Sequence, residues 1–206
     1  MQLIGMLDSP YVRRVAVAMI AASVPFEHRP ISLFRHIDAF TALSPLLKAP
    51  SLIAEDGAAL VDSSVILDYL ATLSPTLAAL RPQSLPAFRA LATALTVMEK
   101  SVQVHYERAV RGPGEQSESW RARAMRQLRV GLDALEAAAP QTWFEGKLGH
   151  ADIAVVCACG FLAGTLGDIV AMQDYPRLAA FAARAEALPI FLAAPAVDGV
   201  VAGGQR

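Results

Sequence analysis

The chain has 206 residues, a length that suits one large domain or two modest ones. Its formal net charge of −1 implies no general attraction to nucleic acid or to a membrane surface. Hydrophobic residues make up 54% of the chain and include much alanine, which favours helices. The longest apolar run, 153–167, spans 15 residues, so we expect a buried helix rather than a membrane span.

The two cysteines and the N-terminal residues indicate the cellular compartment of the protein. Cys157 and Cys159 are two residues apart in the apolar run, so on a helix they point in different directions and make poor disulfide partners. No basic stretch precedes the first apolar residues, so we expect no secretion signal. These features predict a cytoplasmic protein.

The first 75 residues alternate between the periods of strands and helices. An apolar run at Gln2–Leu7 predicts a buried strand, and Pro10 then begins a helix with one apolar face that ends before Pro25. A second strand is expected over 26–33 and a polar helix over about 35–43.

A hairpin and a third helix follow. Residues 51–54 and 59–61 predict two short strands around the turn at 55–57, and the cap at 62–64 begins a helix over 65–73. The predicted order is βαβαββα, which is that of thioredoxin-like domains. The first two strands should be parallel and the hairpin antiparallel.

The rest of the chain has the pattern of an all-α domain. Three prolines between residues 74 and 86 mark a linker. We therefore predict an α+β protein with a thioredoxin-like domain over 1–75, a linker over 76–86 and a helical bundle over 87–206. Long apolar stripes place helices over about 88–109 and 120–135, from about 150, and over 176–188.

Four arginines cluster on the second of these helices: Arg121, Arg123, Arg126 and Arg129. Such a cluster is compatible with nucleic-acid binding, and also with a solvated helix face. We favour the solvated face, because the net charge of the chain is negative. The sequence therefore predicts no nucleic-acid partner and no membrane partner.

A thioredoxin-like half followed by an all-α half resembles the cytosolic glutathione S-transferase superfamily, and the resemblance covers essentially the whole chain. Three motifs match in order and spacing: Ser9–Arg14, Lys48–Pro50 and Asp62–Ser63. The first looks like the serine-type active-site segment of bacterial members. The resemblance implies a homodimer in which glutathione binds the first domain and the helical domain walls the pocket for the second substrate.

The resemblance implies that Ser9 is the catalytic residue, donating a hydrogen bond to the sulfur of glutathione. A free thiol has a pKa of about 8.5, and a hydroxyl at a helix N-terminus favours its ionised form. Ser9 would also serve as an ordinary N-cap of the helix at Pro10, so both roles stay open. The neighbouring Asp8 would oppose a thiolate, and we expect its carboxylate to point away.

The second motif is Lys48–Ala49–Pro50. In the family the corresponding proline is cis, and the residue before it offers its backbone to the cysteinyl part of glutathione, a form of strand addition. Ala49 replaces the usual valine, which leaves a backbone contact intact. Lys48 would pair with the glycine carboxylate of glutathione, and an ordinary solvated lysine is the alternative.

The third motif, Asp62–Ser63, matches the acidic-serine pair that holds the γ-glutamyl end. The Ser63 hydroxyl and the helix N–H groups suit its α-carboxylate, and Asp62 suits its ammonium group. A plain helix cap is the alternative. By loop position, Arg35 and His36 lie where several classes of the family place cations near the glycine end.

The chain departs from the family pattern at the core helix of the second domain. The family begins this helix with Ser or Thr three residues before an aspartate, whereas here Gly149 precedes Asp152. Half of the capping box is therefore missing, and we interpret Asp152 as structural.

The long helix after the linker carries Met98, His105 and Tyr106 on or near its inner stripe, which walls the second-substrate pocket in the family. We favour core packing for Met98. The polar tips of His105 and Tyr106 leave a role in the pocket open. The four histidines are scattered without metal-ligand spacing, so we expect no metal site.

We predict a glutathione transferase that activates the thiol of its co-substrate glutathione for attack on a small hydrophobic electrophile. A glutathione-dependent isomerase or peroxidase, and a non-catalytic binding or regulatory protein on the same fold, are the alternatives. The joint presence of the three motifs favours the enzyme, because a protein that had abandoned the ligand would have no reason to keep them together.

Overall fold

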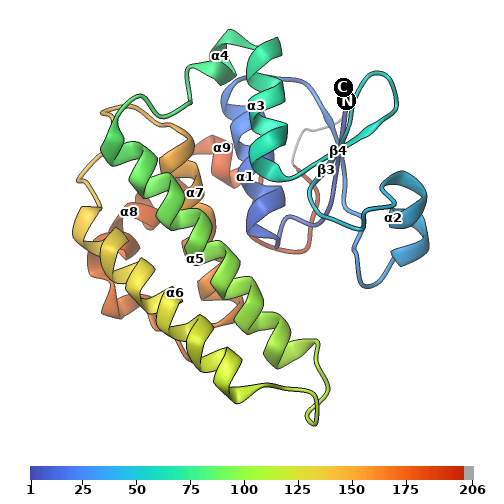
Figure 1. Cartoon of the computed structure of the whole chain (residues 1–206). Helices are drawn as coiled ribbons and strands as arrows, with labels where there is room; N and C mark the ends of the chain where they lie inside the picture. The colour runs from blue at the N-terminus through green and yellow to red at the C-terminus, as the bar shows by residue number, and fades with distance from the viewer. Residues whose placement is uncertain (202–206) are drawn as a thin grey trace. The chain divides into compact units, whose positions relative to one another are not determined.

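The structure is a computed structural model that describes residues 1–201, and it divides into two compact units (Figure 1). The first unit combines residues 1–81 with the chain from 186 onward, and the second comprises 82–185. We predicted that the whole of 87–206 belongs to the helical part. The division differs because the chain returns to the first unit after its long helices; residues 202–206 lie outside the described residues.

The first unit is built on a four-stranded sheet in the order β2-β1-β3-β4. The strands are β1 (Gln2–Ile4), β2 (Glu27–Arg29), β3 (Ser51–Ile53) and β4 (Ala59–Val61). As predicted, β1 pairs in parallel with β2, and the hairpin strands β3 and β4 are antiparallel. Both β1 and β2 are shorter than predicted. Gly5, with φ 134°, follows the end of β1, and Pro30, which has no N–H to donate, follows β2.

Three helices complete the thioredoxin-like order: α1 (Pro10–Ala21), α2 (Ile37–Leu43) and α3 (Ser63–Leu73). Figure 1 shows α1 and α3 on one side of the strands and α2 on the other. The apolar face predicted for α1 is buried together with the sheet residues Leu3 and Leu52. Two short helices, α4 (Pro75–Ala78) and α9 (Pro189–Leu192), also belong to this unit. All of α4 but its first residue lies within the predicted linker, 76–86.

The second unit is helical, as predicted. It contains α5 (Leu85–Ala109), α6 (Glu118–Ala138), α7 (His150–Thr165), the 3-10 turn η1 (Met172–Asp174) and α8 (Pro176–Glu186), whose last residue is counted with the first unit. A side chain at Gly131 would place its Cβ 2.7 Å from a methyl of Val97, so the glycine allows α6 to approach α5 closely. Both cysteines are buried in α7. Within residues 1–201, no helix is long and apolar enough to cross a membrane.

The start of α7 keeps one half of the capping box. Asp152 Oδ2 accepts the N–H of Gly149 at 2.8 Å, and its Oδ1 accepts the N–H of Phe144 at 3.0 Å. Burial raises the pKa of Asp152 to about 6, and these N–H donors oppose that shift. The carboxylate ties the preceding loop to α7, as its structural interpretation requires.

Candidate functional site

Ser9 is the N-cap of α1, with extended backbone angles of φ −71° and ψ 123°. Its Oγ accepts the N–H of Val12 at 3.4 Å, a long hydrogen bond. A hydroxyl that accepts such a bond still has its own proton to donate. The cap therefore leaves the Ser9 proton available for a ligand at the positive end of α1.

Gly5 brings the cis-proline loop to the start of α1. The peptide bond between Ala49 and Pro50 is cis. A Cβ at Gly5 would lie 3.3 Å from the Cβ of Ala49 and 2.6 Å from a methyl of Val12. Because Gly5 has no side chain, the second motif and the helix that Ser9 caps can meet at the end of β1.

The third motif begins α3 and contacts the second. Asp62 is the N-cap, and its Oδ1 accepts the N–H of Ser64 at 2.9 Å. Its backbone has φ 70°, a strained value for a residue with a side chain. The Nζ of Lys48 lies 3.6 Å from Asp62 Oδ2, and both side chains are about half exposed. Such an exposed pair adds little stability, and a ligand can reach both charges from solvent.

Ser63 is held by Arg14, a residue outside the Asp62–Ser63 motif. Arg14 donates from Nη1 to the hydroxyls of Ser63 at 3.1 Å and Ser64 at 3.2 Å. Both Arg14 and Ser63 are only 2% exposed, so the contact belongs to the interior of the unit. The sequence contains an indication of this role. Two consecutive arginines stand between Val12 and Val15 in the apolar part of α1, and arginines buried there need polar partners.

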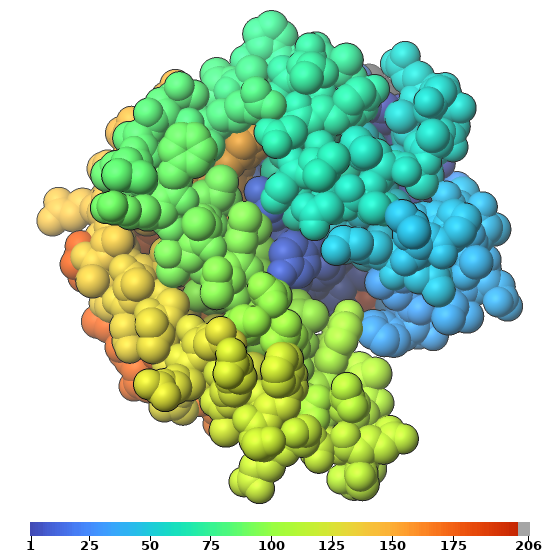
Figure 2. Space-filling view, viewed as in Figure 1, coloured from blue at the N-terminus to red at the C-terminus, as the bar shows by residue number. Residues whose placement is uncertain are grey.

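Arg35 and His36 lie in the exposed stretch before α2, drawn in blue at the surface in Figure 2. Arg35 Nη1 is 2.6 Å from a carboxylate oxygen of Asp198, and this ion pair lowers the pKa of Asp198. Asp8 is exposed, and its charge also acts on Arg35, raising its pKa. His36 accepts the N–H of Ser32 on its Nδ1 at 3.2 Å. The guanidinium of Arg35 is therefore paired with the carboxylate of Asp198, which would compete with a carboxylate of a ligand.

Asp198 belongs to the tail segment, defined here as residues 193–201 after α9. The N–H of Val201 donates to Nδ1 of His28 at 3.2 Å, and His28 Nε2 bonds to the carbonyl of Gly5 at 2.8 Å. This arrangement requires a neutral ring protonated on Nε2. Burial lowers the pKa of His28, which favours that neutral form.

The two residues predicted for the second-substrate pocket lie on α5 in the second unit. The His105 ring meets the edge of Phe161 on α7, with ring centroids 5.8 Å apart. Tyr106 is 39% exposed, and its ring centroid lies 6.1 Å from that of His105. Met98 is fully buried in the core. In the part of the chain that the structure describes, no group of three or more His, Cys, Asp or Glu side chains is placed to hold a metal ion.

A thioredoxin-like unit followed by an all-helical unit defines the fold class of the chain. Residues 3–78 match the family described as "Glutathione S-transferase, N-terminal domain", and residues 118–184 match "Glutathione S-transferase, C-terminal domain". The chain belongs to the glutathione S-transferase family.

Similarity to individual proteins extends over most of the chain. The uncharacterized GST-like protein YibF of Escherichia coli is 28% identical over 166 residues, which cover 79% of this chain and 82% of that protein. A glutathione S-transferase of Methylobacterium radiotolerans, in complex with glutathione sulfonate, is 27% identical with a TM-score of 0.84, covering 94% of this chain and 93% of that one. A family member from Pseudomonas fluorescens with bound glutathione is 30% identical with a TM-score of 0.79, covering 94% and 97%.

Proposed function

We propose that this protein is a glutathione transferase that activates the glutathione thiol for attack on a small hydrophobic electrophile. One observation carries the proposal: the three motifs lie on elements that touch within the first unit. Ala49 lies against Gly5 beside the start of α1, Lys48 pairs with Asp62, and Arg14 holds Ser63. The solved relatives that hold glutathione or its sulfonate support the same ligand.

In the proposed complex, the tripeptide binds in an extended form. Its cysteinyl part pairs with the backbone of Ala49 by strand addition, beside Pro50. The γ-glutamyl ammonium meets Asp62, and its carboxylate meets Ser63 and the N–H groups at the start of α3. Lys48 takes the glycine carboxylate, Arg35 adds positive charge at that end, and His36, whose Nδ1 accepts the N–H of Ser32, offers its Nε2–H. Arg14 acts as a positioning residue, because it holds Ser63 rather than the ligand.

The proposed chemistry is a substitution at carbon. Ser9 donates its proton in a hydrogen bond to the sulfur, which stabilises the thiolate and so lowers the pKa of the thiol. The thiol proton passes to solvent. The thiolate forms a carbon–sulfur bond with the electrophile, and the leaving group departs with the electron pair of the broken bond. His105 and Tyr106 would contact the second substrate, and placing both reactants together supplies much of the rate.

The test combines glutathione calorimetry with turnover of 1-chloro-2,4-dinitrobenzene, an electrophile that loses chloride. Ser9→Ala should lower kcat by about 10- to 100-fold, as expected for the loss of one donor to a developing anion, with less than about threefold change in glutathione Kd. Ser63→Ala should weaken glutathione binding about tenfold instead.

Ser117→Ala is the matched control, because Ser117 is also a helix N-cap and accepts the N–H of Trp120 at 3.3 Å. This variant should lose the N-cap hydrogen bond of α6 and keep the kcat of the wild type. Unchanged kcat in Ser9→Ala would remove Ser9 from the mechanism. A wild-type protein that binds no glutathione would favour the non-catalytic alternative.

We also propose a homodimer, as the family resemblance implies. Val65 and Leu73 on α3 are 50% and 56% exposed, and a second copy would cover such apolar side chains. Light scattering should give twice the chain mass of 21.9 kDa. A mass equal to that of one chain would contradict the dimer.

A further inference from the structure

The second unit carries a groove that the proposed function does not use. Its volume is about 690 Å³, and it lies between the end of α5, one side of α6 and the chain after α7. The floor includes the apolar side chains of Met125 and Ile169. Its charged lining consists of Arg108, Arg121, Arg126 and Arg129.

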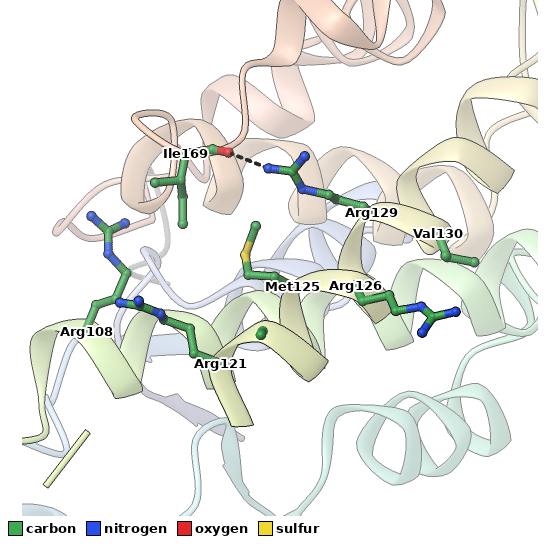
Figure 3. A pocket seen from close by; sticks show the side chains of 8 residues that line it. Arg108, Arg121, Met125, Arg126, Arg129, Val130 and Ile169 are labelled. Carbon is green, nitrogen blue, oxygen red and sulfur yellow. Dashed lines mark hydrogen bonds between the residues drawn. The ribbon is translucent and has the colours of Figure 1, made fainter. Parts of the chain in front are cut away.

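Figure 3 shows how these side chains are arranged. Met125 extends toward Ile169, and Arg129 reaches the carbonyl of Ile169 through a long hydrogen bond of 3.5 Å. Arg121 lies on the same side as Arg108, whereas Arg126 points outward, away from Met125. The apolar floor is therefore bordered by guanidinium groups. Three of them belong to α6, which is drawn in yellow at the surface in Figure 2.

The positive charge of the groove is only partly neutralised. Arg108 forms a two-point ion pair with Asp168, at 3.0 and 2.5 Å. Across residues 1–201, no ion pair or hydrogen bond engages the guanidinium of Arg121 or Arg126. On α6 itself, no carboxylate lies between Glu118 and Asp133. An anionic occupant would therefore meet an Arg121 with no competing carboxylate, and an Arg129 that donates one long bond to a carbonyl oxygen.

The distance between Arg121 and Arg129 helps to decide which kind of anionic molecule fits the groove. Arg121 and Arg129 are eight residues apart on one helix, or about 12 Å along its axis. Two anionic groups about 12 Å apart match this spacing better than a single small anion does. An extended peptide rises about 3.3 Å per residue, so carboxylates about four residues apart can reach both. Nucleic acid fits less well, because Glu118 and Asp133 would repel phosphates that continue along α6.

We propose that this groove docks an acidic segment of another protein, with carboxylates on Arg121 and Arg129 and one apolar side chain on Met125 and Ile169. Arginine–carboxylate contacts around an apolar centre are typical of protein interfaces. The occupant is thus a partner protein, and every residue that lines the groove belongs to the second unit.

The test is a selection of random twelve-residue peptides displayed on phage, with the wild-type protein as bait. Enriched peptides should combine several carboxylates with one large apolar residue. After synthesis, they should bind about tenfold more weakly to the double variant Arg121→Gln/Arg129→Gln, and more weakly to wild type as salt is raised. Met125→Gln should also weaken them, because it places an amide on the apolar floor.

Arg123→Gln is the matched control, because Arg123 is an exposed arginine of the same helix that does not line the groove. It should bind the peptides as the wild type does. The proposal is overturned if no peptide is enriched, if the enriched peptides are neutral, or if Arg123→Gln weakens them as much as the double variant. Single-stranded DNA that binds with the same dependence on Arg121 and Arg129 would overturn the assignment to a protein partner.

Discussion

Helices α1 and α6 both carry arginines in close succession, and they use them in opposite ways. On α1, Arg13 and Arg14 are 1% and 2% exposed, and each meets two or more acceptors within the first unit. On α6, Arg121 and Arg126 extend from the helix without a partner in the described range 1–201. A buried guanidinium organises its own unit, whereas an exposed one is available to another molecule.

The largest effect is expected when the best-partnered arginine is removed. Arg13 forms two bonds of 2.6 Å to Glu186, donates from Nε to the carbonyl of Ala194 at 2.7 Å and lies 5.5 Å from the ring centre of Phe191. Arg13→Met should lower the free energy of unfolding by about 3 kcal/mol, because the carbonyl loses its donor and the partly exposed carboxylate its partner. Urea unfolding measures this loss.

The exposed helix supplies the control for that measurement. Arg123→Met on α6 removes the same charge from an exposed position and should change the unfolding free energy by less than about 0.5 kcal/mol. If both variants lost the same unfolding free energy, burial would not decide how much an arginine contributes to stability.

Asp152 extends the comparison of buried and exposed charged side chains to the second unit. Burial raises the pKa of Asp152 to about 6, above the ordinary value of 3.8 for an aspartate. Below about pH 4 the group is protonated in both the folded and the unfolded chain. Between about pH 4 and 6 mainly the unfolded chain releases the proton, so stability should fall by about 3 kcal/mol as pH rises through this window.

The measurement is the difference in unfolding free energy between wild type and Asp152→Asn at pH 4, 5, 6 and 7. The asparagine variant lacks the titration, so the difference should change up to about pH 6 and then level off. A difference that stays constant with pH would show that the bonds from Gly149 and Phe144 offset the burial of the charge.

Arg14 tests whether a buried arginine can act on the glutathione site without touching the ligand. Arg14→Met should raise the KM for glutathione about tenfold and leave kcat nearly unchanged, because Ser63 would lose the donor that orients it. Arg14→Lys should recover part of the loss. A fall in kcat with unchanged KM would contradict the positioning role.

The smallest effect is expected at the exposed pair of the first unit. Asp198 occupies Arg35, which the proposed complex uses near the glycine carboxylate. Asp198→Asn should therefore tighten glutathione binding about two- to fivefold at low salt, and the gain should vanish in an Arg35→Gln background. Weaker binding in Asp198→Asn would mean that Asp198 holds Arg35 in place.

Local patterns predicted most elements of the fold. The hairpin at 51–61 and the start of α1 at Pro10 follow from turn and cap residues, and the structure confirms them. The sequence did not predict that the chain from 186 onward joins the first unit. That assignment depends on Arg13 finding Glu186 and Ala194, a pairing of distant residues that no local pattern records.

Only those residues of the candidate site that belong to the three short motifs could be predicted from the sequence. Ser9, Lys48 and Asp62 stand at turns and caps, where short patterns are informative. The contact between Arg14 and Ser63 links α1 to α3 and has no such pattern. The cluster on α6 was interpreted as a solvated face, but the structure divides it: Arg123 lies outside the groove, and Arg108 enters it from α5.

The pairing of Arg13 with Glu186 and Ala194 spans 173 and 181 residues, and this separation has a consequence for folding during synthesis. At roughly 5 to 20 residues per second, the ribosome needs on the order of 5 to 20 seconds after residue 81 to deliver residue 186. During that interval the first unit lacks the acceptors that its buried guanidinium requires. All residues of the helical unit are synthesised in the meantime, so the first unit is the first to begin and the last to be complete in sequence.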